Sequence, residues 1–309
     1  MLRQKTIRRP VDGSGIGLHS GNRVDMRLLP APIDSGIVFR RSDLTPAVEI
    51  PANADLVRDT MLCTALVNAD NVRVATIEHL MSALYGLGID NIIIEVSAPE
   101  IPIMDGSAAP FVYLLQQAGI QEQDAAKRFM EILEPIEVRD GDKWARLVPF
   151  NGMRFDFTID FTHPVFRYRN AHIRLDVNTQ DYVHEISRAR TFGFLQDIEY
   201  LHSNGLALGG SLDNAVVVDE FRVMNERGLR YDDEFARHKL LDAMGDLYLI
   251  GAPIRGWYVG YKSGHDLNNK LALAMLERTD AWRWREVDGA EGASDTSVDP
   301  LLNGQLHYR

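Results

Sequence analysis

The chain runs twice through the same order of secondary structure, and this order constrains its fold more than any other feature of the sequence. Short strands come first and helices with a strand among them follow, and after residues 119–127 the strand pattern starts again. Elements in such an order pack as layers, with helices against one face of a sheet. The 309 residues leave room for two domains of ordinary size. We therefore predict an α+β fold with two related domains, residues 1–126 and residues 127–309.

The predicted strands are rich in β-branched residues and are bounded by Gly, Asp, Asn and Pro. They cover residues 36–40, 71–74, 91–96, 130–133, 136–139, 145–149, 154–161 and 257–261. The predicted helices cover residues 76–86, 108–118, 233–250 and a segment after residue 268. Thr76 is the expected N-cap of the first helix, and Gly86 or Gly88 its end. The polar segment 119–127 marks the predicted domain boundary, and residues 289–297 are expected to be flexible.

The charge balance excludes several classes of partner. Lys and Arg number 33 against 44 Asp and Glu, and the resulting net charge of −11 argues against general binding to nucleic acid or to anionic membranes. No apolar stretch approaches the ~18 residues that a membrane span needs, and the basic N-terminus lacks the apolar core of a signal peptide. The single cysteine, Cys63, cannot form an internal disulfide, which fits a reducing compartment. We expect a monomeric, cytoplasmic protein without membrane insertion.

The predicted helix at 233–250 carries one histidine and two carboxylates on one face. With about 100° of turn per residue, Asp242 and Asp246 lie about 40° and 80° from His238, opposite the apolar side of the helix. Lys239 lies at the edge of this polar face. A His and an Asp four residues apart can chelate one metal ion, although a catalytic zinc needs a third protein ligand. The alternative is an ordinary solvated face.

A third ligand and a base are available in the first half of the chain. Glu78 and His79 lie at the start of the predicted helix 76–86, away from its apolar stripe. The positive end of a helix favours a neutral imidazole and a charged carboxylate. A carboxylate next to a metal ligand can take a proton from a metal-activated water. The alternative is that Glu78 only satisfies the helix dipole and that His79 lies on the surface.

His265 is a candidate proton donor, because it lies in a predicted turn between a strand and a helix. Asp246 could pair with this histidine and keep it protonated. A helix cap or an ordinary surface histidine is an equally good interpretation of His265 alone. Cys63 lies in an apolar stretch, which favours a small buried side chain over a nucleophile.

These residues belong to seven short motifs with a fixed order. The motifs occupy residues 15–21, 76–80, 101–108, 187–194, 208–211, 238–242 and 263–265. In this order and spacing they closely resemble the UDP-3-O-acyl-N-acetylglucosamine deacetylases of lipid A biosynthesis. The resemblance covers roughly residues 3–285, which is nearly the whole chain. It implies hydrolysis of the substrate's N-acetyl group, with release of acetate.

The resemblance also implies two β-α-α-β layered domains, each with an insert, and an active site between them. In this family a metal ion is held at the positions that match His79, His238 and Asp242. The ion implied is zinc (Zn²⁺), with ferrous iron (Fe²⁺) as the alternative. The partner implied is a small-molecule acylated UDP-sugar.

Further roles follow from the same resemblance. Glu78 matches the general base, His265 the proton donor and Thr191 an additional donor to the oxyanion. Asp246 matches the acid that orients the histidine, and Lys239 matches a contact on the phosphate side of the substrate. As a hypothesis, Glu78 deprotonates the attacking water, and His265 and Thr191 stabilise the developing oxyanion.

Further substrate contacts are expected on both halves of the chain. The second insert, residues 191–217, matches a hydrophobic passage for the acyl chain, and it contains Phe192, Phe194, Gly210, Ser211, Ala215 and Val217. Contacts from the first half are expected at Leu18, His19 and Cys63, and Cys63 is expected near the metal but not as a ligand. Candidates for nucleotide contacts are Lys143 and Lys262, which suit a diphosphate, and Phe161, which suits uracil stacking.

The sequence departs from the family pattern at two places. Asp266 follows His265 where a small residue is expected. A carboxylate that pointed inward would raise the pKa of His265, although adjacent side chains often point apart. The C-terminal tail lacks the apolar end that marks some members for proteolysis.

Two other functions remain open at this point. Another metal-dependent amidohydrolase, such as a peptidase, would not need the apolar segment 191–217. A metal-stabilised binding protein without turnover would unfold when the metal is removed.

Overall fold

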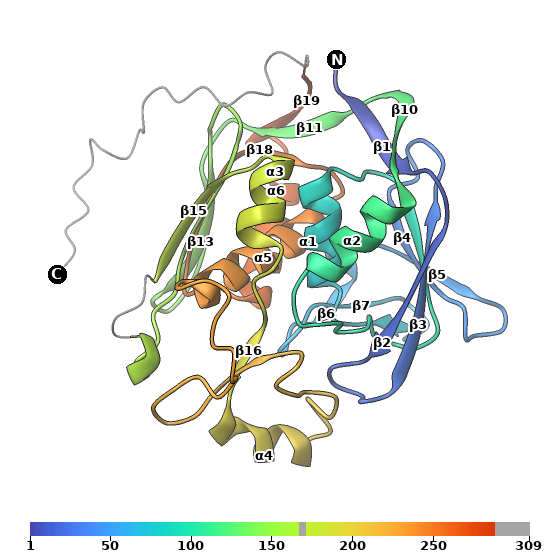
Figure 1. Cartoon of the computed structure of the whole chain (residues 1–309). Coiled ribbons are helices and arrows are strands. Elements are labelled where there is room, and N and C mark those ends of the chain that lie inside the picture. The colour runs from blue at the N-terminus through green and yellow to red at the C-terminus, as the bar shows by residue number, and fades with distance from the viewer. Residues whose placement is uncertain (167–170, 288–309) are drawn as a thin grey trace, which may run out of the picture.

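The computed structural model describes residues 1–166 and 171–287, so the predicted flexible stretch 289–297 and the C-terminal tail lie outside the described residues. Two β-sheets form the outer layers, and the main helices lie between them (Figure 1). This layering confirms the predicted α+β class. The division into domains 1–126 and 127–309 stays a prediction, since buried apolar residues of both halves form one continuous core.

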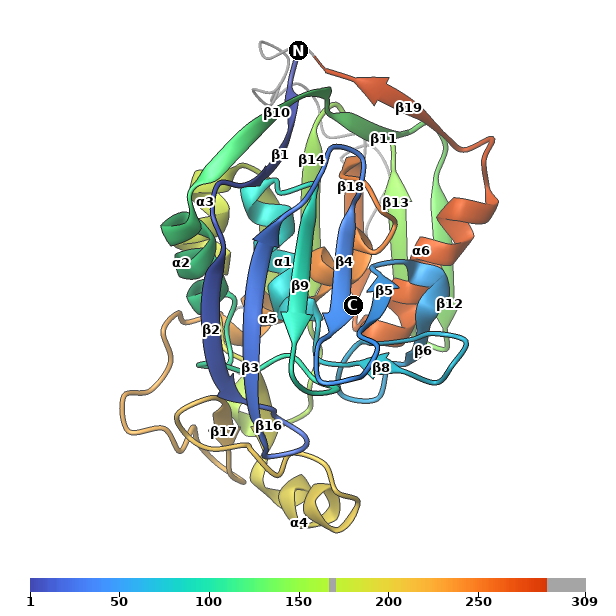
Figure 2. The same cartoon turned by 90° about the vertical axis from the view of Figure 1, so that its right-hand side faces the viewer.

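The sheet of the first half is mixed and is seen face on in Figure 2. Its strands follow in the order β2 (Val11–Ile16), β3 (Arg23–Pro30), β9 (Ile92–Val96), β4 (Ile37–Arg41) and β5 (Val48–Pro51). β4 and β9 are parallel, and the other neighbours are antiparallel. Alternate side chains of β3 and β9 are buried, as a half-exposed sheet requires. The inner face is covered by helices α1 (Glu78–Leu87) and α2 (Ala109–Ala118).

The sheet of the second half is centred on β18 (Ile254–Tyr261). Its other strands are β11 (Arg128–Ile132), β12 (Ile136–Asp140), β13 (Lys143–Val148), β14 (Met153–Thr158), β15 (His172–Asp176) and β19 (Trp282–Glu286). β18 runs parallel to β11 and β14 and antiparallel to β13. Helices α5 (Glu234–Tyr248) and α6 (His265–Glu277) lie on its inner side (Figure 1).

Smaller elements join and extend these layers. They are β1 (Arg3–Ile7), η1 (Ala54–Leu56), β6 (Val57–Asp59), β7 (Ala65–Val67), β8 (Arg73–Val74), β10 (Ile120–Ala126), η2 (Pro164–Phe166), α3 (Thr179–Asp181), η3 (Tyr182–Ile186), β16 (Phe192–Phe194), α4 (Leu195–Ser203) and β17 (Val216–Val218). The insert with β16, α4 and β17 lies at the opposite end of the molecule from β1 and β10 (Figure 1).

Three local predictions need correction. The polar segment 119–127 is not a simple connection, because most of it forms β10, which pairs with β1 through backbone hydrogen bonds. Thr76 is not the N-cap of α1, since Ile77 takes that place and Thr76 itself has a positive φ of 57°. Gly88 ends α1 in the left-handed conformation, as predicted. The helix expected after residue 268 begins at His265.

Helices α1 and α5 cross at a glycine, and this crossing positions the candidate site. A Cβ atom at Gly245 would lie 2.0 Å from the backbone oxygen of Glu78, so only glycine permits this approach. Both helices are buried on nearly all sides, because each lies between the other helix and a sheet. Among the described residues, no helix combines the length and apolar character needed to cross a membrane.

Candidate active site

The helix crossing brings together two histidines and one aspartate from distant parts of the chain. His79 comes from the first turn of α1, and His238 and Asp242 come from successive turns of α5. Oδ1 of Asp242 lies 3.3 Å from Nε2 of His238 and 3.5 Å from Nε2 of His79. Two ligand atoms of a tetrahedral zinc, each about 2.0–2.1 Å from the ion, lie roughly 3.3 Å apart. The three side chains therefore have the spacing of a ligand set.

The polar atoms of this group support a cation between them. Oδ1 of Asp242 is buried and has no hydrogen-bond partner, whereas Oδ2 accepts a hydrogen bond from Nζ of Lys239 at 2.9 Å. Nδ1 of His238 lies 3.0 Å from the carbonyl oxygen of Ala189, so donation to that carbonyl leaves the lone pair on Nε2. An unpaired buried carboxylate oxygen facing two imidazole nitrogens is explained by an ion.

The pKa values agree with this arrangement. Burial lowers the pKa of His238 to about 3, so the imidazole is neutral and able to bind a metal. Burial alone would raise the pKa of Asp242, but its neighbours, among them the charged Lys239, outweigh burial and hold the pKa well below its usual range. The prediction that these side chains share a face is confirmed, and the alternative of a solvated face is wrong because both are buried.

Glu78 and His265 form a second group beside the first. Nε2 of His265 lies 4.0 Å from Oε1 of Glu78, while Oε2 of Glu78 accepts a hydrogen bond from the backbone N–H of Thr64 at 3.0 Å. Burial raises the pKa of Glu78 above its ordinary value. A carboxylate with a raised pKa next to an imidazole is suited to proton transfer.

Asp246 holds the other side of the His265 ring. Its Oδ2 lies 2.9 Å from Nδ1 of His265 and accepts a hydrogen bond from Nδ2 of Asn268 at 2.8 Å. Burial acts to lower the pKa of His265, but Asp246 and Glu78 outweigh it and raise the pKa to about 9. The imidazole is therefore protonated at neutral pH, although it stands at the positive end of α6.

Asp266 has no part in this effect. Its carboxylate points toward solvent and pairs with Nζ of Lys270 at 2.6 Å. The sequence left the direction of Asp266 open, and its outward direction removes the condition under which it would raise the pKa of His265.

A cleft of about 450 Å³ opens over both groups. Most of the predicted site residues line it, from both halves of the chain: Leu18, Glu78, His79, Lys143, Phe161, Thr191, Phe192, His238, Lys239, Asp242, Lys262 and His265. Asp246 is buried behind His265. Lining residues that the sequence did not single out include Thr60, Leu62, Phe157, Ile159 and Asp160.

The remaining predicted contacts lie outside the walls of this cleft: His19, Cys63, Phe194, Gly210, Ser211, Ala215 and Val217. Cys63 is 2% exposed, and burial raises the pKa of its thiol to about 12, so it is a buried thiol, as predicted. His19 belongs to the loop that carries Leu18, and its backbone N–H donates to Oε1 of Glu100 at 2.7 Å. The insert contacts this loop through hydrogen bonds from Leu208 to His19 and from Gly209 to Leu18.

Aromatic rings cover the end of the cleft next to the insert. Phe161 stacks on Phe166 with centroids 4.8 Å apart and meets Phe192 at 5.8 Å and Phe194 at 6.0 Å. Phe192 contacts the His238 ring edge on at 6.3 Å. The ligand group therefore has an apolar neighbour on the insert side.

Two of the three predicted phosphate contacts are already paired with carboxylates. Nζ of Lys239 bonds to Asp242 as described, and Nζ of Lys262 lies 2.6 Å from Asp142 and 3.6 Å from Asp160. Lys143 stands at the first position of β13 and lines the cleft. An anion that enters the cleft therefore meets lysines within a mixed-charge wall.

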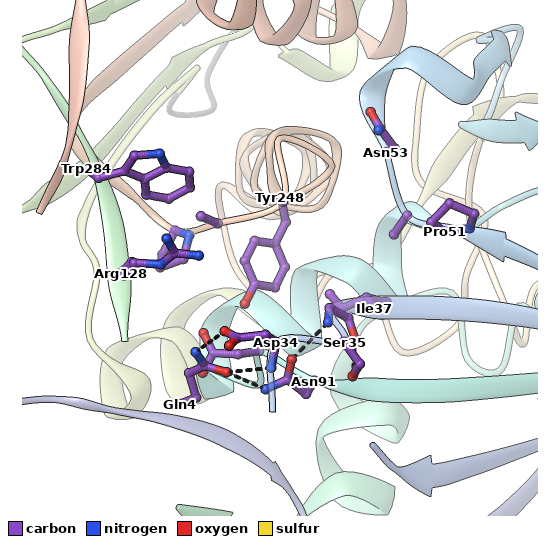
Figure 3. Close-up of a pocket in the computed structure, with 16 residues that line it drawn as sticks. Gln4, Asp34, Ser35, Ile37, Pro51, Asn53, Asn91, Arg128, Tyr248 and Trp284 are labelled. Carbon is purple, nitrogen blue, oxygen red and sulfur yellow. Dashed lines mark hydrogen bonds between the residues drawn. The ribbon is translucent and has the colours of Figure 1, made fainter. Parts of the chain in front are cut away.

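A second cavity, of about 240 Å³, lies away from these residues (Figure 3). Its polar side chains bond to one another: Nε2 of Gln4 donates to Asp34 at 2.7 Å, and Nδ2 of Asn91 donates to Gln4 at 2.8 Å. Arg128 lies over the ring of Trp284 at 4.8 Å. The metal-type cluster found among the described residues is in the first cleft, which is therefore the candidate active site.

Comparison with known proteins agrees with the motifs. The family model described as UDP-3-O-acyl N-acetylglycosamine deacetylase matches residues 4–277. A protein of Shewanella frigidimarina named UDP-3-O-acyl-N-acetylglucosamine deacetylase is 56% identical to this chain. The alignment covers 100% of this chain and 100% of that protein. A protein of the same name from Vibrio vulnificus is 57% identical over 98% of this chain and 99% of its own length. Another, from Mannheimia succiniciproducens, is 59% identical over 94% of this chain and 95% of its own length.

Proposed function

The chain belongs to the UDP-3-O-acyl-N-acetylglycosamine deacetylase family, and on this premise we propose that it hydrolyses the N-acetyl group of UDP-3-O-acyl-N-acetylglucosamine, a step of lipid A biosynthesis, in the cytoplasm. The products are acetate and the free amine. The observation that carries the proposal is the buried, unpartnered Oδ1 of Asp242, which faces His79 and His238 in the same cleft as the Glu78–His265 pair.

His79, His238 and Asp242 would hold the metal. Two imidazoles and a carboxylate are a common donor set for a catalytic zinc, and the same donors also suit ferrous iron. The bound ion would supply Lewis acidity, which polarises the acetamide carbonyl and activates a water. The neutral state of His238 and the ionised state of Asp242 fit this role.

Glu78 is the proposed general base. Its carboxylate takes a proton from the attacking water, and its raised pKa makes it a stronger base than an exposed glutamate. The N–H of Thr64 fixes Oε2, which leaves Oε1 toward the cleft and His265.

His265 is the proposed acid. In its protonated state it stabilises the negative charge that develops on the carbonyl oxygen, and it then gives its Nε2 proton to the leaving amine. Asp246 keeps Nδ1 protonated and turns Nε2 toward Glu78. Thr191, which lines the cleft near the insert, is the proposed additional donor to the oxyanion.

The two ends of the substrate have different needs. We assign the 3-O-acyl chain to the apolar side of the cleft formed by Phe192 and the insert, where burial of each CH₂ group contributes about 0.8 kcal/mol. The diphosphate is assigned to Lys239, Lys143 and Lys262, and the uracil to Phe161. Local lysines thereby meet an anionic substrate within a chain whose net charge is −11.

Acetate release from the acylated UDP-sugar tests the proposal. The assay is run with the protein as isolated, after treatment with a chelator, and after zinc or iron has been restored. We expect turnover to disappear with the chelator and to return with metal. Activity on a peptide panel but not on the UDP-sugar would instead favour another amidohydrolase. Loss of the folded circular dichroism spectrum with chelator, without turnover before it, would favour a metal-stabilised binding protein.

A further inference from the structure

Thr64 forms hydrogen bonds with the two carboxylates that flank His265, those of Glu78 and Asp246. It lies outside the seven sequence motifs described above. It is 1% exposed and directly precedes β7 in the first half of the chain. Its backbone N–H donates to Oε2 of Glu78 at 3.0 Å, and its hydroxyl donates to Oδ1 of Asp246 at 2.6 Å. Thr64 therefore forms hydrogen bonds with one carboxylate from each half of the chain, Glu78 from the first and Asp246 from the second.

Three hydrogen bonds and one longer contact link four residues in a ring. Thr64 bonds to Glu78 and Asp246, Asp246 bonds to Nδ1 of His265 at 2.9 Å, and Nε2 of His265 lies 4.0 Å from Glu78. The carbonyl oxygen of Thr64 also accepts a hydrogen bond from the N–H of Ile77, at 3.4 Å, directly before α1. The main chain of Thr64 is thus tied to the start of the helix that carries Glu78.

The hydroxyl of Thr64 determines how Asp246 is held. Asp246 is buried, and its Oδ2 is shared by His265 and Asn268. The Thr64 hydroxyl donates to its other oxygen, Oδ1. Loss of that donor would leave Oδ1 as a buried acceptor without its hydroxyl partner, which is unfavourable. The carboxylate would then rotate or shift toward other donors, and His265 would move with it.

We propose that Thr64 is a positioning residue that sets the separation and orientation of Glu78 and His265 across the boundary between the two halves of the chain. This proposal rests on the proposed function in so far as Glu78 and His265 are taken as base and acid. Thr64 acts through Glu78 and Asp246, with which it forms hydrogen bonds.

Two variants separate the hydroxyl from the shape of the side chain. Thr64→Val keeps the size and the backbone N–H but removes the hydroxyl, and Thr64→Ser keeps the hydroxyl. A displacement of about 1 Å in a catalytic group can cost about 100-fold in rate. We therefore expect Thr64→Val to lower kcat by about 10- to 100-fold with KM changed less than about 3-fold, and Thr64→Ser to retain kcat within about 3-fold of wild type.

Thr6→Val is the matched control. Thr6 is also buried, and its Oγ1 accepts a hydrogen bond from the N–H of Ala31 at 3.1 Å. It belongs to β1, at the opposite end of the molecule from the insert (Figure 1). It should lose stability on substitution, but kcat per folded molecule should not change. If Thr64→Val lowers only Tm, as Thr6→Val does, and retains wild-type kcat, the positioning role is wrong.

A readout that needs no substrate distinguishes this proposal from the proposed function. The imidazole resonances of His265, followed by nuclear magnetic resonance, should shift in Thr64→Val, return in Thr64→Ser and stay unchanged in Thr6→Val. If the wild-type protein releases no acetate but this pattern appears, the proposed function fails and the positioning role stands. Unchanged His265 resonances in a folded Thr64→Val protein overturn the positioning role, whatever the activity.

Discussion

Nζ of Lys239 lies 2.9 Å from Oδ2 of Asp242, one turn further along α5. The lysine thereby occupies one oxygen of the carboxylate and leaves the other, Oδ1, facing His79 and His238. It also compensates part of the carboxylate's charge in a buried place, which lowers the pKa of Asp242. The family resemblance assigns Lys239 to the phosphate side of the substrate. Its contact with Asp242 gives it a second effect, on the orientation and charge of that carboxylate.

The first prediction concerns the ligand group. Asp242→Ala removes the carboxylate that faces both imidazoles, so we expect metal content to fall far below one ion per chain and acetate release to be lost. Elemental analysis of the purified protein measures the ion. Asp266→Ala is the control, because that carboxylate lies nearby but points to solvent. A full complement of metal in Asp242→Ala would exclude this residue as a ligand.

The second prediction concerns the base. Glu78→Gln keeps the shape and a hydrogen-bond acceptor for Thr64 but cannot take a proton, so kcat should fall by about 100-fold or more while metal remains bound. Initial rates and metal content are measured on the same sample. A variant that retains wild-type turnover would contradict the role of Glu78.

The third prediction is a pH profile with two limbs. Glu78 must be deprotonated, so activity should rise as pH increases through its raised pKa. His265 must be protonated, so activity should fall as pH increases through its pKa of about 9. In Asp246→Asn the main charge that raises the pKa of His265 is lost, and the alkaline limb should move toward lower pH. An alkaline limb that stays in place in Asp246→Asn would refute this assignment.

The fourth prediction concerns the helix crossing. Gly245→Ala would place a Cβ atom 2.0 Å from the backbone oxygen of Glu78, and a main chain cannot move away as a flexible side chain can. We expect a lower Tm together with weaker metal binding, because the helix that carries His79 must shift. Gly193→Ala is the control, since its Cβ would meet nothing within 4 Å. Thermal unfolding and metal titration of both variants measure these two effects. Wild-type Tm and wild-type metal affinity in Gly245→Ala would show that the helices can adjust.

The fifth prediction concerns the insert. Ala215 is half-buried next to β17, and a charge placed there should weaken substrates with long acyl chains far more than truncated ones. KM values for both substrate lengths are compared in Ala215→Asp, with the more exposed Leu212→Asp as control. Equal losses for long and truncated substrates would argue against an acyl-binding role of this segment.

The order of strands and helices could be predicted because apolar periodicity is a local property. The family assignment from the seven motifs is confirmed by the comparisons. Strand β10 was missed because it pairs with β1 through its backbone, and such pairing needs no apolar side chains. The apolar pattern of α5 could not predict that its polar face is buried, because the helix that covers this face, α1, is far away in the sequence.

The site could be predicted only in part for a related reason. His238, Asp242 and Asp246 follow from spacing within one helix, but the meeting of His79 with them depends on the packing of α1 against α5. Thr64 and Asn268 were missed because a single hydroxyl or amide leaves no pattern in the sequence. Their link to the site is visible only from the hydrogen bonds that they donate to Asp246.

The crossing of α1 and α5 has a consequence for how the protein matures. His79 and the pair on α5 are far apart in the sequence, so the proposed ligand set cannot form before the N-terminal and C-terminal halves have docked. A nascent or truncated chain that ends before α5 lacks two of the three ligands and has no means of retaining the ion there. If these three residues hold the ion as proposed, metal occupancy therefore reports that both halves have been synthesised and have docked.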